Sequence, residues 1–323
     1  MSTYYQIFGG KVNVVSADPS NPIEGQIWYN TTTELLKYRG VTSAAWASGG
    51  NLATARRYLA GAGTQTTGLG FGGDTAGITT PSVSTEEYNG TAWSGGGNMG
   101  TARTYLAGCG LQTVALAFGG AIYSGGVINK NETEEYNGTS WTAGGNLGTA
   151  RRLLGGAGTQ TVGLAFGGRI TTGGITNTEE YDGSSWTAGG NMGTGRYTLA
   201  GVGIQTAGLA FGGNGGNTLT EEYDGSSWTS GGTLNTGRTG LSGSGTQTAG
   251  LGFGGYASKA NTELYDGTSW TNSTNMTTGR NGLAGAGTQT SGLAMGGIVS
   301  TTFQSATEEY SGAFIATKTV TAT

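Results

Sequence analysis

The stretch TEEYDGSSWTAGGNMGTGR, residues 178–196, contains two adjacent glutamates, an Asp-Gly pair, a tryptophan and an arginine. In isolation it would suit an acid–base site, a phosphate-binding loop or a platform for a sugar. Its components, however, recur along the chain at fixed spacing. Six times an arginine follows a tryptophan by ten residues, and a Gly-Gly pair begins sixteen residues after that arginine. The stretch is therefore part of a repeating unit rather than an isolated site.

The repeat is defined by five kinds of residue. The tryptophans are Trp46, Trp93, Trp141, Trp186, Trp228 and Trp270, and the arginines are Arg56, Arg103, Arg151, Arg196, Arg238 and Arg280. The glycine pairs begin at Gly72, Gly119, Gly167, Gly212, Gly254 and Gly296. A tyrosine lies five residues before each of the last five tryptophans, and the series continues at Tyr310, where Ile315 occupies the next tryptophan position. The residue two before each tyrosine is a glutamate: Glu86, Glu134, Glu179, Glu221, Glu263 and Glu308.

Each unit divides into four strand-like segments, which in the third unit are 151–159, 161–168, 178–183 and 185–191. The second segment alternates large and small residues with the period of a strand. The Asp-Gly and Asn-Gly pairs between the last two segments are typical of tight hairpins. All length variation lies between Gly-Gly and the tyrosine, where the interval is 16, 17, 14, 11, 11 and 14 residues. We predict four paired strands per unit, with one loop of free length between the second and third.

Gly-Gly after an apolar strand, then Glu-x-Tyr, Trp and Arg, resembles the kelch repeat over about residues 46–312. The resemblance implies an all-β β-propeller of four-stranded kelch-like blades, whose first strands line a central channel. It also implies that the loops between strands two and three and the links between blades share one face. We favour seven blades, with residues 1–49 as a divergent N-terminal blade and 50–323 as six kelch-like blades closing one propeller. The alternative is six blades plus an N-terminal anchor, because residues 21–40 are similar to a hairpin module of tailed-phage fibre and appendage proteins.

The repeated residues are expected to be structural. Adjacent residues of a strand point to opposite faces, so the paired glutamates cannot act on one bond. We predict that the recurring glutamates, such as Glu134, Glu179 and Glu221, pair with repeat arginines, such as Arg103, Arg151 and Arg196. We predict that the aromatic rings pack between blades: Trp93, Trp141, Trp186, Trp228 and Trp270.

Composition excludes several functions. The chain has no histidine and one cysteine, Cys109, so histidine-based catalysis and zinc or copper sites are not expected, and we predict no enzyme activity and no cofactor. A net charge of −4 without a basic run argues against nucleic-acid binding. No apolar run reaches the length of a transmembrane helix, and the N-terminus does not resemble a signal peptide.

The loops of free length are the candidate binding surface. They hold aromatic and charged residues on a scaffold that hardly changes: Tyr123, Lys130, Arg169, Tyr256, Lys259 and Phe303. We expect a non-enzymatic virion protein made in the host cytoplasm: a phage tail fibre, tail tip or capsid decoration. Its partners would be other virion proteins, a host-surface glycan or receptor, and further copies of itself. The alternatives are a propeller lectin with repeated sites between blades, and neutral variation of exposed loops.

Overall fold

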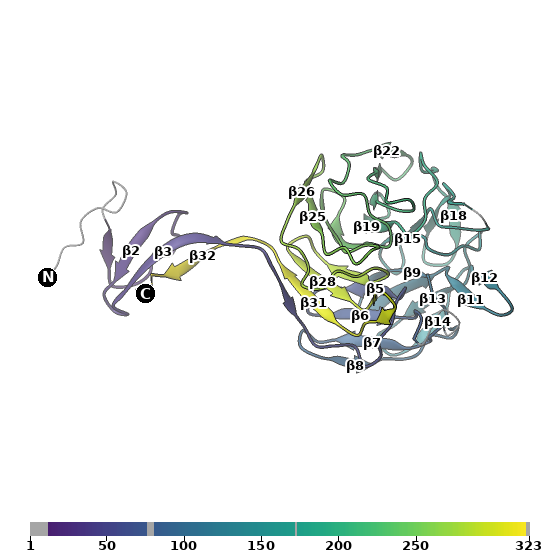
Figure 1. Ribbon diagram of the computed structural model, residues 1–323, viewed down its shortest axis with the longest axis horizontal. Coiled ribbons are helices and arrows are strands. Elements are labelled where there is room, and N and C mark those ends of the chain that lie inside the picture. Colours follow the sequence, from purple (N-terminus) through teal and green to yellow (C-terminus); the bar gives the residue numbers. More distant parts are fainter. Residues whose placement is uncertain (1–11, 76–80, 172, 321–323) are drawn as a thin grey trace. The chain divides into compact units, whose positions relative to one another are not determined.

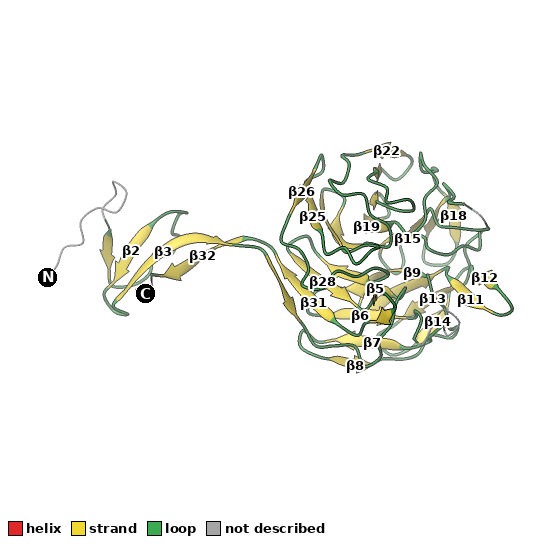
Figure 2. Cartoon of the chain, in the orientation of Figure 1, coloured by secondary structure: helices red, strands yellow, loops and turns green. Residues whose placement is uncertain are grey.

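The computed structural model describes residues 12–75, 81–171 and 173–320. All regular secondary structure in these ranges is β-strand. The strands form seven four-stranded sheets and two two-stranded hairpins (Figure 1). Figure 2 shows strands joined by loops throughout. The chain divides into two compact units, Met1–Ala45 with Gly312–Thr323, and Trp46–Ser311. The predicted all-β class is confirmed, and the repeated four-stranded sheets of Trp46–Ser311 are consistent with a β-propeller.

Six of the sheets, numbered here 1 to 6, make up the unit Trp46–Ser311. Sheets 1 and 2 are β5 (Ala60–Gly63), β6 (Gly68–Phe71), β7 (Thr85–Tyr88), β8 (Trp93–Gly95), and β9 (Ala107–Leu111), β10 (Val114–Phe118), β13 (Thr133–Tyr136), β14 (Trp141–Ala143). Sheets 3 and 4 are β15 (Gly155–Gly158), β16 (Gly163–Phe166), β17 (Thr178–Tyr181), β18 (Trp186–Ala188), and β19 (Ala200–Ile204), β20 (Ala207–Phe211), β21 (Thr220–Tyr223), β22 (Trp228–Ser230). Sheets 5 and 6 are β23 (Ser242–Thr246), β24 (Ala249–Phe253), β25 (Thr262–Tyr265), β26 (Trp270–Asn272), and β27 (Ala284–Gly287), β28 (Ser291–Met295), β31 (Thr307–Ser311), β4 (Ala45–Ser48).

Two hairpins extend from the loops between second and third strands. They are β11 (Ala121–Tyr123) with β12 (Val127–Asn129) in sheet 2, and β29 (Ile298–Val299) with β30 (Thr302–Phe303) in sheet 6. Since adjacent strands within each sheet are antiparallel, these loops and the links between sheets lie on one face of the unit. We call it the variable face. The tight turns between strands one and two and between strands three and four lie on the opposite face.

The first strands of the six sheets pack one against the next in a ring, and β27 contacts β5 to complete it (Figure 1). Glycine permits this close approach. A Cβ added at Gly201 of β19 would lie 2.5 Å from Cζ of Phe166 in the preceding sheet, and one at Gly108 of β9 would lie 2.3 Å from Cζ of Phe71. Small residues are therefore needed at these positions of the innermost strands, because a phenylalanine of the neighbouring sheet occupies the space.

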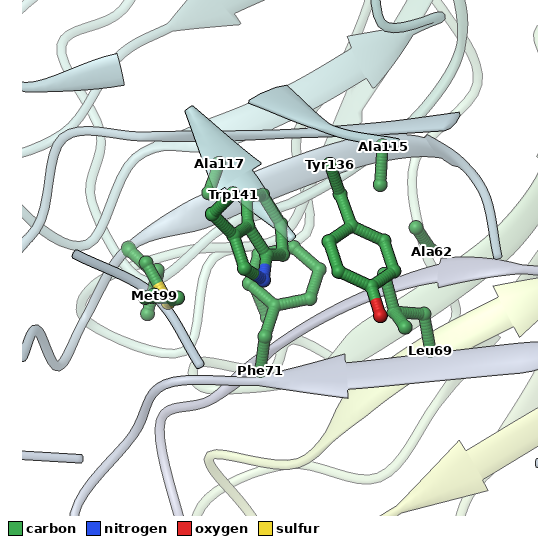
Figure 3. Packing of buried hydrophobic residues seen from close by; sticks show 10 residues of the cluster. Ala62, Leu69, Phe71, Met99, Ala115, Ala117, Tyr136 and Trp141 are labelled. Carbon is green, nitrogen blue, oxygen red and sulfur yellow. The ribbon is translucent and has the colours of Figure 1, made fainter. Parts of the chain in front are cut away.

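Between sheets, large aromatic and aliphatic side chains form the core. Figure 3 shows the cluster between sheets 1 and 2, where the ring of Trp141 lies 4.9 Å from Phe71 and 4.9 Å from Tyr136, measured between centroids. Leu69 and Tyr136 are fully buried beside them. Equivalent clusters lie at other interfaces between sheets. Burial of rings of this size supplies much of the apolar contact that a glycine-rich chain otherwise lacks.

Sheet 6 is completed by a strand from far away in the sequence. Its outer strand is β4, so Trp46 takes the place that the repeat would give to a tryptophan at position 315. Trp46 Nε1 donates to Thr262 Oγ1 at 3.0 Å, and its ring lies 5.2 Å from that of Tyr310. Ile315 lies instead in β32 (Phe314–Thr319), in the other unit. The outer strand of sheet 6 thus makes the same tryptophan–threonine bond to its preceding sheet as the outer strands of the other sheets do.

The unit formed by the two ends of the chain is a sheet of β1 (Asn13–Val15), β2 (Ile27–Asn30), β3 (Leu35–Thr42) and β32. Trp28 is fully buried, and its Nε1 donates to Asp18, which also accepts from Asn30 and Lys37. The seven-blade arrangement favoured from the sequence is not confirmed. The strands before Ala45 pair with β32 in a separate unit, and the ring of inner strands in Trp46–Ser311 has six members.

Candidate functional site

Every repeat contains a buried ion pair between its arginine and the recurring glutamate. The Nη2–Oε1 distances are 2.9 Å for Arg56–Glu86, 2.8 Å for Arg103–Glu134, 3.1 Å for Arg151–Glu179, 2.8 Å for Arg196–Glu221, 2.9 Å for Arg238–Glu263 and 3.0 Å for Arg280–Glu308. Burial lowers the pKa of Arg151 to about 10, and the neighbouring carboxylate opposes that shift. The expected pairing is present in all six repeats. It ties the start of each sheet to its third strand.

The second glutamate of the Glu-Glu-Tyr motif joins neighbouring sheets. The Tyr136 hydroxyl of sheet 2 donates to Glu87 of sheet 1 at 2.6 Å. The same bond recurs at four other interfaces between neighbouring sheets, which we call seams. Burial and the carboxylate raise the pKa of Tyr136 to about 12. The adjacent glutamates therefore point to opposite faces and serve different sheets, as strand geometry predicts.

The repeat tryptophans also connect sheets. Trp141 Nε1 donates to Thr85 Oγ1 of the preceding sheet at 2.9 Å, and the equivalent bond is made at all six seams. A glutamine that the sequence analysis did not single out adds a further link. Gln112 Nε2 donates to the carbonyls of Gly68 and Tyr88 in the preceding sheet, and every sheet has an equivalent glutamine. The repeated residues thus act within the framework.

On the variable face, a closed ring of backbone hydrogen bonds surrounds the central axis; we call the space inside this ring the mouth. Each sheet contributes the residue two positions after its repeat arginine: Tyr58, Tyr105, Leu153, Thr198, Gly240 and Gly282. The amide of each donates to the carbonyl of the previous one, at 2.6–3.1 Å, and Tyr58 donates to Gly282 to close the circle. All six have φ between 50° and 64°, a conformation that non-glycine residues seldom adopt. Such strain is typical of functional sites, and here four of the six residues, Tyr58, Tyr105, Leu153 and Thr198, place a side chain around one mouth.

A ring of leucines lies directly beneath this mouth. The next residue of each sheet is a leucine that is 5–6% exposed: Leu59, Leu106, Leu154, Leu199, Leu241 and Leu283. These leucines line both an outer hollow of about 90 Å³ and an inner one of about 130 Å³, and so lie between the two. The leucine side chains therefore separate two small hollows along the central axis.

Two of the predicted loop residues reach the mouth. The Tyr123 hydroxyl donates to that of Tyr105 at 3.0 Å, and the rings of Tyr105 and Tyr58 are 4.4 Å apart. Phe303 lies 4.8 Å from the Arg57 guanidinium, which is also 5.1 Å from the Tyr58 ring. A continuous aromatic and cationic cluster thus runs across sheets 6, 1 and 2.

The other predicted residues lie at separate places. The Arg169 guanidinium is 5.1 Å from the Tyr197 ring, on sheets 3 and 4. Lys130 forms an ion pair with Glu132 at 2.5 Å. Tyr256 is 67% exposed, and with Lys259 it borders a hollow of about 420 Å³ between the loops of sheets 4 and 5. The six predicted residues share a face, but they do not converge on one site.

Asp74 is a buried acid under the aromatic cluster. It is fully buried, and its nearest cation is Arg57, whose Nε lies 3.4 Å from Oδ2. Burial raises the pKa of Asp74 to about 6, while Thr104 and Arg57 act in the opposite direction. The group is therefore poised to change charge in mildly acidic solution.

The sequence analysis missed the residues nearest the mouth: Arg57, Tyr58, Asp74, Tyr105, Arg152 and Tyr197. A signal existed for all of these residues except Asp74. The two positions after each repeat arginine read Arg-Tyr, Thr-Tyr, Arg-Leu, Tyr-Thr, Thr-Gly and Asn-Gly, so they vary within an otherwise fixed segment. The predicted first segment, 151–159 in the third unit, includes these positions, but the strand in the structure begins only at Gly155.

In residues 12–75, 81–171 and 173–320 there is no cluster of three or more His, Cys, Asp or Glu side chains able to hold a metal. Burial raises the pKa of the Cys109 thiol to about 12. No described segment forms a helix long and apolar enough to cross a membrane. No protein-family model matches the chain, and no curated protein matches it.

Proposed function

We propose that Trp46–Ser311 is a six-bladed kelch-like propeller that serves as a non-enzymatic binding scaffold in a phage virion appendage, such as a tail fibre, tail tip or capsid decoration. The observation that carries this proposal is that the contacts within and between sheets are repeated, whereas the residues on the variable face differ from sheet to sheet. The ion pairs, Tyr–Glu bonds and Trp–Thr bonds repeat from sheet to sheet, whereas aromatic and charged side chains of different kinds gather on the variable face. A rigid frame with diverse residues on one face suits recognition of a host surface or another virion protein.

The unit formed by the chain ends is proposed to attach the propeller to the particle. It holds seven of the fifteen large apolar side chains that are exposed in the described residues: Val14, Ile23, Leu35, Val41, Phe314, Ile315 and Val320. A small unit with this much exposed apolar surface suits a protein contact. Other virion proteins and further copies of the chain are the proposed partners.

The lectin alternative, with one sugar site at every seam, has less support. Those sites would need the repeat rings to be open to solvent, but the repeat tyrosines are buried, Trp141 and Trp270 are only 9% and 4% exposed, and Trp93, Trp186 and Trp228 are half-buried. Their polar atoms are also bonded within the framework.

Labelling of purified phage particles tests the proposal. Antibodies raised against the full chain should decorate a distinct structure on the particle in electron micrographs. Mass spectrometry of the same particles should recover peptides of the chain. Particles that infect normally but contain none of it would contradict the proposal.

A further inference from the structure

Cations on the six-sheet unit are few, and most are neutralised by an acid. The six repeat arginines pair with glutamates, Arg57 pairs with Asp74, and Lys130 pairs with Glu132. Among the described residues of this unit, three cations have no acidic group within 4.0 Å: Arg152, Arg169 and Lys259. Two of these three, Arg152 and Arg169, are direct neighbours.

Arg152 and Arg169 face each other across a short antiparallel bridge on the variable face of sheet 3. The Arg169 amide donates to the Arg152 carbonyl at 2.8 Å, and the Arg152 amide donates to the Arg169 carbonyl at 3.2 Å. Residues opposed in this way project their side chains to the same side. Burial, and then the charge of Arg169, lower the pKa of Arg152. Two like charges held together destabilise the fold, so the stability of the sheet does not explain their placement.

Neighbouring sheets hold both guanidinium groups in place. Arg152 Nη1 donates to Asn129 Oδ1 at 2.5 Å and to the Ile170 carbonyl at 3.2 Å, and Asn129 comes from the hairpin of sheet 2. Arg169 stacks over Tyr197 of sheet 4, and its Nε is buried without a hydrogen-bond partner. The two groups are thus oriented from three sheets while retaining donors that no protein acceptor uses. Fixed donors of this kind lower the entropy lost on binding.

We propose that Arg152 and Arg169 form a binding site for an oxyanion carried by an acidic saccharide, the group being a carboxylate or a sulfate. Paired guanidinium groups match the geometry of such oxyanions through parallel charge-assisted hydrogen bonds. The flanking ring of Tyr197 offers an apolar face for a sugar ring. This inference rests on the proposed function, because it names the class of ligand that the variable face would take.

The test uses the full purified chain and polymers of defined charge. Oligogalacturonate presents carboxylates, dextran sulfate presents sulfates, and neutral dextran is the uncharged control. Calorimetric titration should show binding to at least one of the two acidic polymers and none to dextran. Arg152→Gln and Arg169→Gln should each weaken that binding by about tenfold or more, because each removes charge-assisted hydrogen bonds.

Val162→Glu is the matched control, since it also lowers the net charge by one, but on the opposite face of the same sheet, where Val162 is exposed. It should change the affinity less than about twofold, as expected of a screened distant charge. Melting curves identify any variant that fails to fold. In that case Arg152→Lys is used, because it keeps the positive charge but lacks the two parallel N–H donors of a guanidinium; it should bind the acidic polymer more weakly than the unaltered chain does. An equal loss in Val162→Glu, or no binding of either acidic polymer to the unaltered chain, would overturn the proposal. Particle labelling remains an independent test of the virion assignment.

Discussion

The seam between sheets 5 and 6 departs from the repeat at two positions that lie together. At the other five seams a tyrosine donates to a glutamate, and a glycine packs against the hydroxyl. Here Leu264 replaces the glutamate and Ser273 replaces the glycine, and Ser273 Oγ lies 2.6 Å from the Tyr310 hydroxyl. A Cβ at the equivalent Gly231 would lie 2.6 Å from the tyrosine hydroxyl of its seam. The two replacements should therefore compensate for each other.

A double-mutant cycle at this seam tests the compensation. Ser273→Gly should lower the free energy of unfolding in two ways. It removes one hydrogen bond, worth about 1 kcal/mol, and it makes the unfolded chain more flexible, which costs about 0.5–1 kcal/mol on folding. Adding Leu264→Glu to that variant restores the arrangement of the other seams, with a charge-assisted bond worth about 1.5–3 kcal/mol. Leu264→Glu alone gains little, because the Ser273 side chain occupies the space beside the tyrosine hydroxyl. The expected coupling is about 1–2 kcal/mol in favour of the double variant.

Urea unfolding of the four proteins, followed by tryptophan fluorescence, measures the coupling. The reciprocal change at the next seam, Glu222→Leu with Gly231→Ser, provides the matched control. It should also be better tolerated as a pair than its single changes predict. Coupling within about 0.5 kcal/mol of zero at both seams would refute the reasoning, since that is the usual limit of additivity.

Three further predictions concern the framework and the variable face. Gly201→Ala should lower stability by about 1–3 kcal/mol in chemical unfolding, because its Cβ would lie 2.5 Å from Phe166, whereas Gly95→Ala, with no atom within 4 Å, should have little effect. Arg151→Met should cost about 3–5 kcal/mol by leaving its glutamate buried and unpaired, and a loss below about 1 kcal/mol would contradict the role given to the ion pair. The pKa of Asp74 is raised from 3.8 to about 6, so the folded chain keeps a proton that the unfolded chain releases, and this group's contribution to stability falls as pH rises through that range. The melting temperature of the unaltered chain minus that of Asp74→Asn should therefore decrease between these pH values, and a constant difference would show that Asp74 titrates normally.

The framework could be predicted from the sequence because each contact recurs at fixed spacing. The Arg151–Glu179 pair, for example, follows from a repeated arginine and a repeated glutamate within one antiparallel sheet. The pairing that completes sheet 6 was harder to predict, because its strands β4 and β31 come from opposite ends of the repeat region. The tyrosine missing before Trp46 and the tryptophan missing after Tyr310 are two halves of one motif, which only a circular arrangement brings together.

For the variable face, the sequence predicted which loops form it but not how their side chains contact one another. The loops were identified from their length and composition, but contacts such as Tyr123 with Tyr105 and Arg169 with Tyr197 join residues of different loops or sheets. No spacing rule links such residues, since the repeat leaves these positions free. The left-handed conformation at Tyr105 likewise depends on the ring of neighbours around the axis, not on local preference.

Competition for adsorption tests the central claim, that the variable face makes the binding contact of a virion appendage. Purified full chain is added to host cells before the particles, and the rate of adsorption is measured. The unaltered chain should slow adsorption, and so should a variant altered on the opposite face, Val114→Ser with Val162→Ser. A variable-face variant, Tyr123→Ser with Tyr256→Ser, should lose this effect while keeping its melting temperature. Equal inhibition by both folded variants, or none by the unaltered chain, would contradict the account.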